Sequence, residues 1–172
     1  MPLCLLCDRL RPNNFRGGLS VQEPARRLVR IGLIAALYVA ITYVLQATSF
    51  FPTQFRLAEA LTLLPMIFPE AVWGLGIGCF IANLLSPAGL IDVILGSLTT
   101  LLAAYVTYRF RWRLIGYLAP IVLNAVIVSA YLRLLANLPY WITAISIAFS
   151  EAVVVLGLGY PLLWYLRRWQ QR

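Results

Sequence analysis

The sequence contains no histidine and no lysine, and only 12% of its 172 residues are charged. Without histidine, any site lacks the side chain that most often acts as a general base or metal ligand. A soluble domain keeps about a quarter of its residues charged, so this chain has too little polar surface for one. The P-loop pattern G-x-x-x-x-G-K-[ST] is also absent, which excludes ATP hydrolysis by that route. We therefore expect a protein that is not an enzyme.

Cysteine is scarce as well, with three residues in the chain: Cys4, Cys7 and Cys79. The Cys4-x-x-Cys7 pair is half of a zinc-knuckle pattern, and no second half follows. We expect no metal site, and we expect this pair to be incidental on a tail that faces a reducing cytosol.

Hydrophobic residues make up 62% of the chain and gather in runs that approach the roughly 20 residues of a membrane-spanning helix. The pattern predicts an all-α integral membrane protein with six transmembrane helices. An arginine-rich, flexible tail at 1–27 precedes a single transmembrane domain at 28–170. The predicted spans are about 28–46, 57–68, 71–85, 90–108, 114–135 and 140–166.

The arginines predict the orientation. With six spans and the N-terminus inside, 12 of the 14 arginines lie on the inner side, and only Arg56 and Arg133 lie outside. Five or seven spans would place a strongly basic segment outside. We expect both termini in the cytoplasm and the protein in the cell membrane. Because the charges lie beside the ends of apolar runs, they argue against a nucleic-acid partner.

The 57–68 and 71–85 spans are short, at about 18 and 22 Å of helix against a hydrocarbon core of about 30 Å. Either the flanking loops enter the membrane depth and border a midplane cavity, or the helices tilt in a locally thinned bilayer.

Four carboxylates lie in or beside the spans: Glu59, Glu70, Asp92 and Glu151. Glu70 falls in the inner turn, where water can solvate it. The other three must be protonated, paired, near an interface or turned to a wet cavity, because a charge exposed to lipid is costly. Arg56 and Glu59 have the i, i+3 spacing of a local pair, whereas Asp92 and Glu151 have no local basic partner. Such an excess of acceptors favours a ligand rich in N–H donors, although a proton or sodium path would also use carboxylates.

Neutral polar residues are expected at a similar depth. Asn83 lies toward the outer end of its span, and Asn124 shares a helix face with Tyr117 and Tyr131. Asparagine in a membrane span often forms hydrogen bonds that hold two helices together. A ring of acceptors, amides and tyrosines also suits the edge and face of a planar heterocycle. The candidate substrate-binding residues are Arg56, Glu59, Asn83, Asp92, Asn124, Tyr131 and Glu151.

The first span carries Gly32, Ala36 and Ala40 at four-residue spacing. Strips of small residues let membrane helices approach closely. The strip serves either packing within the bundle or docking onto another membrane protein.

Three motifs in the central segment carry a family resemblance. They are Gln54-Phe55-Arg56-Leu57-Ala58-Glu59-Ala60-Leu61-Thr62-Leu63-Leu64-Pro65, Gly74-x-x-x-Gly78-Cys79-x-x-Ala82-Asn83-Leu84, and Asp92-x-x-x-Gly96-x-x-x-Thr100-Leu101-Leu102-Ala103-Ala104. The segment resembles the QueT family of queuosine-precursor transporters, which are substrate-binding (S) components of energy-coupling factor (ECF) transporters. The match is closest over residues 50–104, and the number of spans extends it to about 28–170.

The resemblance implies uptake of a 7-deazaguanine: 7-aminomethyl-7-deazaguanine, 7-cyano-7-deazaguanine or queuine. It also implies assembly with a transmembrane coupling subunit and two ATP-binding cassette ATPases, which would use the ATP while this chain binds no cofactor. Ala36-x-x-x-Ala40 matches the docking motif of such S components. A guanine-like edge offers adjacent N–H donors that one carboxylate can accept together, which agrees with the acceptor-rich spans.

The residues alone leave two other classes of function possible. A proton- or sodium-coupled carrier for a small heterocycle or cation would use the same carboxylates, but the chain lacks an evident inverted repeat. A small membrane enzyme would have to work with carboxylates alone. ATP-dependence of uptake separates the importer from the carrier, and analysis of the bound ligand for products separates the enzyme.

Overall fold

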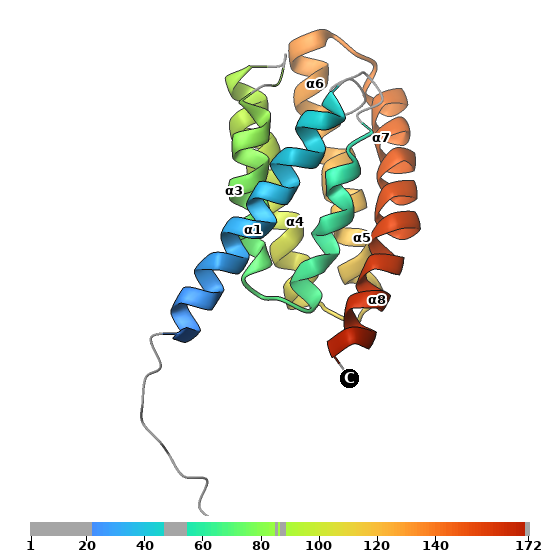
Figure 1. Ribbon diagram of the computed structural model, residues 1–172. Helices are drawn as coiled ribbons and strands as arrows, with labels where there is room; N and C mark the ends of the chain where they lie inside the picture. The colour runs from blue at the N-terminus through green and yellow to red at the C-terminus, as the bar shows by residue number, and fades with distance from the viewer. Residues whose placement is uncertain (1–21, 47–54, 85, 87–88, 171–172) are drawn as a thin grey trace, which may run out of the picture.

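The computed structural model describes residues 22–46, 55–84, 86 and 89–170, and every regular element in these ranges is helical (Figure 1). The all-α prediction is therefore confirmed for this part of the chain. Most of the predicted tail, including Cys4 and Cys7, lies outside the described residues.

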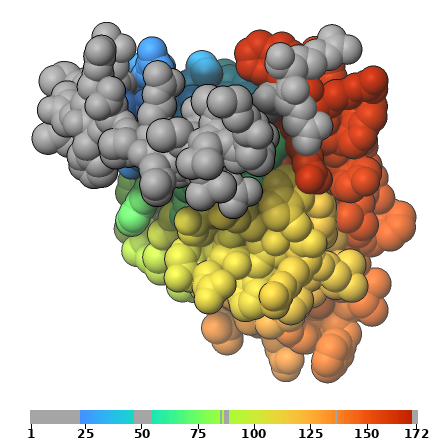
Figure 2. All heavy atoms as spheres, turned by 90° about the horizontal axis from the view of Figure 1, so that it is seen from below, coloured from blue at the N-terminus to red at the C-terminus, as the bar shows by residue number. Residues whose placement is uncertain are grey.

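The helices form six rods, as predicted. In chain order they are α1 (Gln22–Val44); η2 (Leu57–Met66); α3 (Ala71–Asn83); η3 (Asp92–Gly96) with α4 (Ser97–Arg109); α5 (Leu114–Leu123), η4 (Asn124–Val128) and α6 (Ser129–Ala136); and α7 (Tyr140–Val154), η5 (Val155–Gly159) and α8 (Tyr160–Gln170). Both ends of the described chain lie at the lower end of the bundle in Figure 1. Viewed from that end, the green residues of α3 and the red residues of α8 lie on opposite sides of the yellow residues of α4 and α5 (Figure 2).

Three helices are long and apolar enough to cross a membrane: Glu23–Val44, Leu114–Leu135 and Tyr140–Trp169. The first begins before the predicted start at residue 28. An acidic Glu23 and a proline at position 24 both suit a first helical turn, because the turn has free N–H groups and a positive dipole end. The second and third rods are shorter apolar helices, so their predicted shortness is confirmed.

The second rod, η2, is a 3₁₀ helix, where the sequence predicted an ordinary span over 57–68. Its hydrogen bonds run from i to i+3, and Pro65 lies inside it. A 3₁₀ helix rises about 2 Å per residue, so ten residues of η2 reach about 20 Å. All residues from Ala58 to Met66 are buried. The other rods therefore enclose η2, and its tighter backbone is shielded by protein.

Helices α1 and α3 approach each other closely in the core. A methyl group added at Gly78 would lie 2.9 Å from Cβ of Tyr38 and 3.0 Å from the carbonyl oxygen of Ala35. One added at Gly74 would lie 3.0 Å from the carbonyl oxygen of Ile31. The Gly74-x-x-x-Gly78 motif is therefore a contact strip within this chain.

Three short π-helical segments, η3, η4 and η5, interrupt the later rods. Segment η5 packs against η2, and a methyl group at Gly159 would lie 2.8 Å from the carbonyl oxygen of Ala60. Asp92 begins η3 and Asn124 begins η4. Such π segments frequently occur at functional sites because the wider turn redirects side chains.

Candidate substrate-binding site

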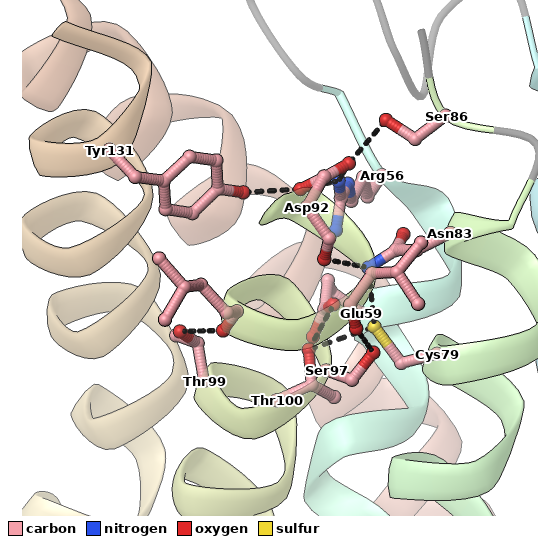
Figure 3. Close-up of polar contacts among 12 residues, drawn as sticks. Arg56, Glu59, Cys79, Asn83, Ser86, Asp92, Ser97, Thr99, Thr100 and Tyr131 are labelled. Atoms are coloured by element: carbon pink, nitrogen blue, oxygen red, sulfur yellow. Dashed lines mark hydrogen bonds and ion pairs between the residues drawn. The ribbon is translucent and has the colours of Figure 1, made fainter. Parts of the chain in front are cut away.

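All seven candidate substrate-binding residues are buried, with exposed fractions between 0 and 6%. They come from every rod except α1: Arg56 and Glu59 from η2 and the residue before it, Asn83 from α3, Asp92 from η3, Asn124 from η4, Tyr131 from α6, and Glu151 from α7. We call these seven residues the polar cluster. Figure 3 shows five of its members, Arg56, Glu59, Asn83, Asp92 and Tyr131, pointing toward one another between the rods.

The carboxylate of Asp92 organises one half of the polar cluster. Nη2 of Arg56 lies 3.2 Å from its Oδ2. The hydroxyl of Tyr131 donates to Oδ1, and the hydroxyl of Ser86 donates to Oδ2. The amide of Asn83 donates to the backbone carbonyl of Asp92 at 3.0 Å. Both oxygens of this buried carboxylate thus have donors, and an arginine balances its charge.

This arrangement corrects one sequence prediction. Arg56 pairs with Asp92, and not with Glu59. Asp92 has no basic partner nearby in the sequence, as predicted, but it has this distant one. The physical reason is local geometry: Arg56 precedes η2 with an extended backbone, φ −88° and ψ 95°, so it does not share a helix face with Glu59.

Glu59 organises the centre of the polar cluster from η2. Its Oε1 accepts hydrogen bonds from the hydroxyl of Tyr38 at 2.6 Å and from the hydroxyl of Thr100 at 3.2 Å. Thr100 in turn accepts from the thiol of Cys79 at 3.4 Å. Its Oε2 is buried and has no hydrogen-bond partner among the described residues.

Glu151 on α7 repeats this pattern. Its Oε1 accepts a hydrogen bond of 3.1 Å from the amide of Asn124. Its Oε2 is also buried without a hydrogen-bond partner among the described residues.

These two carboxyl groups define what the site can do. A buried acceptor left without a donor is costly, and few remain in native proteins. Glu59 and Glu151 each use one oxygen to fix the side chain and keep the other available. The pair can accept hydrogen bonds from a ligand with several N–H groups, or it can hold a proton.

Tyr38, Cys79, Ser86 and Thr100 belong to this hydrogen-bond network but were not among the candidates. Cys79 and Thr100 lie inside the sequence motifs quoted above, and this position could have identified them as site residues. For Tyr38 the indication was weaker: a second polar residue, Thr42, follows four positions later on the same helix face. Both Tyr38 and Thr42 are buried.

Two further residues lie away from the polar cluster. Glu70 lies directly before α3, whose first turn is at the lower end of the bundle in Figure 1, and it pairs with Arg30 at 2.8 Å. The ring of Tyr117 packs 6.1 Å from that of Tyr160, and the face predicted for Tyr117, Asn124 and Tyr131 does not extend as far as Tyr131. Segment η4 separates Tyr117 from Tyr131 and changes the helical register between them.

The small-residue strip of the first span faces outward. Gly32, Ala36 and Ala40 are exposed, and a methyl group added at Gly32 would meet no atom within 4 Å. The inner face of α1 is formed instead by residues such as Ile34, Ala35 and Tyr38. The strip therefore takes no part in packing among the described residues.

Comparisons with known proteins agree with this architecture. The sequence model of the QueT transporter family matches residues 28–168. The queuosine precursor transporter QueT of Lactococcus lactis subsp. cremoris is 41% identical over 76 residues, which cover 43% of this chain and 44% of that protein. No solved structure matches the chain. With a match over most of its length and with several long apolar helices, the chain is a multi-pass membrane protein that belongs to the QueT transporter family.

Proposed function

We propose that this chain is the substrate-binding (S) component of an ATP-driven ECF-type importer for a queuosine precursor. The substrate class is a 7-deazaguanine: 7-aminomethyl-7-deazaguanine, 7-cyano-7-deazaguanine or queuine. The family and the name of the Lactococcus relative support the substrate class. The observation that carries the proposal is the pair of buried carboxyl groups, Glu59 and Glu151, each with one available oxygen, and the amide of Asn124 bonded to Glu151.

The chemistry of a 7-deazaguanine fits these acceptors. Its guanine-like edge presents a ring N–H next to an exocyclic amino group, and one carboxylate can accept from both. An aminomethyl substituent adds a cation, which the second carboxylate would balance. Asn124 can donate to a carbonyl oxygen and accept from an N–H group, so its amide can form hydrogen bonds with the other polar groups of the ligand ring.

The remaining members of the polar cluster position this site. Arg56 and Asp92 balance each other's charge, so the ligand does not have to. Tyr131 and Asn83 hold Asp92 from two other rods. We assign these residues to the binding site as its supporting wall.

The arginines support an orientation with both termini in the cytoplasm. The connection from the end of α4 to the start of α5 carries Arg109, Arg111 and Arg113, and the last turns of α8 carry Arg167 and Arg168. In Figure 1 these helix ends lie at the same end of the bundle as the two ends of the described chain. Positively charged residues accumulate on the cytoplasmic side of membrane proteins. Arg56 before η2, Asn83 at the end of α3 and Asp92 at the start of η3 then lie toward the outer side, which suits capture of a nutrient.

Partner docking is assigned to Gly32, Ala36 and Ala40 on α1. Exposure of the strip supports a role outside this chain. Within lipid, a smooth strip lets a partner's helix approach closely where no hydrophobic driving force exists. The partners are a transmembrane coupling subunit and two ATP-binding cassette ATPases, which bind and hydrolyse the ATP.

A second candidate is a proton- or sodium-coupled secondary carrier. The same two carboxyl groups favour it, because buried carboxylates with available oxygens also serve ion-coupled transport. This candidate requires uptake by the chain alone, driven by an ion gradient.

Calorimetric titration of the purified chain with the three precursors and guanine tests the proposal. We expect tight binding of at least one 7-deazaguanine without any partner. The absence of binding heat for all four compounds would refute the substrate class. Uptake into vesicles with and without ATP and partners then separates the two mechanisms, since gradient-driven uptake by the chain alone would establish the carrier.

A further inference from the structure

A cavity of about 660 Å³ is lined by the first turns of α1, the first turn of α3 and the last turns of α4. These helix ends are at the lower end of the bundle in Figure 1, whereas Asn83 of the polar cluster is at the other end of α3. Arg26, Arg27 and Arg30 line it from α1, and Tyr105 and Tyr108 line it from α4. The arginines therefore face a concave surface that includes hydroxyl donors. We call it the basic cavity.

The charge of the basic cavity suits a singly charged anion. Its lining includes two carboxylates, Glu23 and Glu70, beside the three arginines, which leaves a net charge of +1. Glu70 is paired with Arg30 at 2.8 Å. Arg26 and Arg27 are thus the side chains that would balance a bound anion, with Glu23 partly opposing them.

An apolar groove of about 340 Å³ adjoins the basic cavity on the outside of α3 and α4. Trp73 lines both. The groove follows α3 from Trp73 to Phe80, or about 10 Å along the helix. Ser97 is the one polar side chain in the groove's lining, and its hydroxyl donates to the carbonyl of Val93. The groove therefore offers a ligand only apolar contact.

We propose that the basic cavity and the groove together bind one phospholipid with an anionic headgroup. The phosphodiester lies against Arg26 and Arg27, and one acyl chain passes Trp73 and follows the groove. A basic cavity between helices at a membrane surface suits such headgroups, and tryptophan and tyrosine suit the boundary between headgroup and chain. Because Trp73 lines both the basic cavity and the groove, the two surfaces are continuous. One lipid can therefore place its headgroup in the cavity and an acyl chain in the groove.

Native mass spectrometry of the full chain in detergent tests this assignment. The probes are dioleoyl-phosphatidylglycerol, dioleoyl-phosphatidylcholine with identical chains, and glycerol phosphate without chains. We expect one retained phosphatidylglycerol, with an affinity about tenfold above that for phosphatidylcholine. Each arginine near a membrane surface contributes roughly a fivefold factor, so Arg26→Gln with Arg27→Gln should remove most of that preference.

The controls separate a site from general surface charge. Arg167→Gln with Arg168→Gln removes the same charge at the same end of the bundle without touching the cavity lining. This control should keep the preference, as should Arg26→Lys with Arg27→Lys, which also checks that the double variant folds. Trp73→Ala should weaken both lipids several-fold, while Trp141→Ala, an exposed tryptophan on α7, should not.

Three results would overturn the proposal. Equal affinities for the two lipids would show that the site does not recognise the anionic headgroup. An equal loss of preference in the Arg167 and Arg168 control would show that general surface charge causes the preference. Displacement of the lipid by glycerol phosphate at a similar concentration would identify a free phosphate site and remove the groove from the assignment.

Discussion

Tyr38 on α1 donates a 2.6 Å hydrogen bond to Oε1 of Glu59 on η2, and the two side chains are almost completely buried. Tyr38 lies on the inner face of α1, between Ala36 and Ala40 on its exposed face. The same helical turn thus carries the proposed docking strip on one side and a contact to the proposed ligand site on the other.

Tyr38→Phe should weaken ligand binding by roughly tenfold while the fold is kept. The change removes one donor from Glu59 and leaves Thr100 as its partner, and a hydrogen bond to a charged group contributes about 1.5–3 kcal/mol. Calorimetry with the best 7-deazaguanine measures the loss. Tyr43→Phe on the exposed face of α1 is the matched control and should bind normally. Equal affinities of Tyr38→Phe and wild type would show that Glu59 needs no support from α1.

The carboxylates should separate into three kinds. Glu59→Gln and Glu151→Gln should each lower affinity more than tenfold, since they remove acceptors for the ligand. Asp92→Asn should mainly lower the melting temperature, because it leaves Arg56 buried without its counter-charge. Glu70→Gln should bind like the wild type. If Glu70→Gln were the weakest binder of the four, the location of the site would be wrong.

Gly96→Ala should crowd the polar cluster and reduce affinity at least several-fold. The added methyl group would lie 2.7 Å from Nδ2 of Asn83 and 2.9 Å from Oδ1 of Asp92, so these side chains have to move. Gly157→Ala is the matched control, because a methyl group there meets no atom within 4 Å. Unchanged binding by both variants would place the ligand away from Asp92.

Ala36→Trp and Ala40→Trp should abolish ATP-driven uptake and leave ligand binding intact. Both positions are exposed, so the bulky ring meets the partner's helix and not the chain's own core. Leu37→Trp, at an exposed position outside the strip, should retain uptake. Uptake in reconstituted vesicles and calorimetry on the isolated chain are the paired measurements. Loss of ligand binding in the alanine variants would assign the strip to the protein's own fold.

The pair of Arg30 and Glu70 should make stability depend on pH at acidic values. Burial opposes ionisation of Glu70, but the hydrogen bond from Arg30 and the charges of Arg30 and Arg27 lower its pKa below the usual value. A lowered folded-state pKa means that the stabilisation is present at neutral pH and is lost as the pH falls through that lowered value.

Wild type should therefore melt about 1–3 °C above Glu70→Gln at pH 7, and this difference should shrink on acidification below pH 5. Glu23→Gln serves as a control for general charge effects at this end of the bundle. A constant difference at all pH values would show that Glu70 acts through its shape and not its charge.

Charge in an apolar sequence was the informative signal for the site. Glu59, Asp92 and Glu151 stand in apolar runs where an ionised group exposed to lipid is costly, so each was expected to point inward, and the structure buries all three. Tyr38 and Thr100 gave no comparable signal, because hydroxyl groups are ordinary in membrane helices and bond to many partners.

The helix types could not be predicted from the pattern. Every residue of η2 from Ala58 onward is buried, so no polar face marks whether the turn holds 3.0 or 3.6 residues. The pattern also did not show that Arg56 precedes η2 in an extended conformation, which is why its expected pair with Glu59 does not form. The register changes at η3, η4 and η5 could not be predicted either. Hydrophobic residues occur on all faces of these helices, so the sequence pattern does not show that a helix shifts by one residue.

The π segments have a consequence for insertions and deletions. A π turn contains one residue more than an α turn, so one residue can be removed from η4 and the helix can still close. Because the π turn already takes up the extra residue, the deletion would leave Tyr131 on nearly the same face relative to the residues before η4. A one-residue gap at η4, in a relative or in an engineered variant, is therefore compatible with the same side chains lining the interior. A one-residue deletion in a regular α-helical stretch would instead rotate everything after it by about 100°.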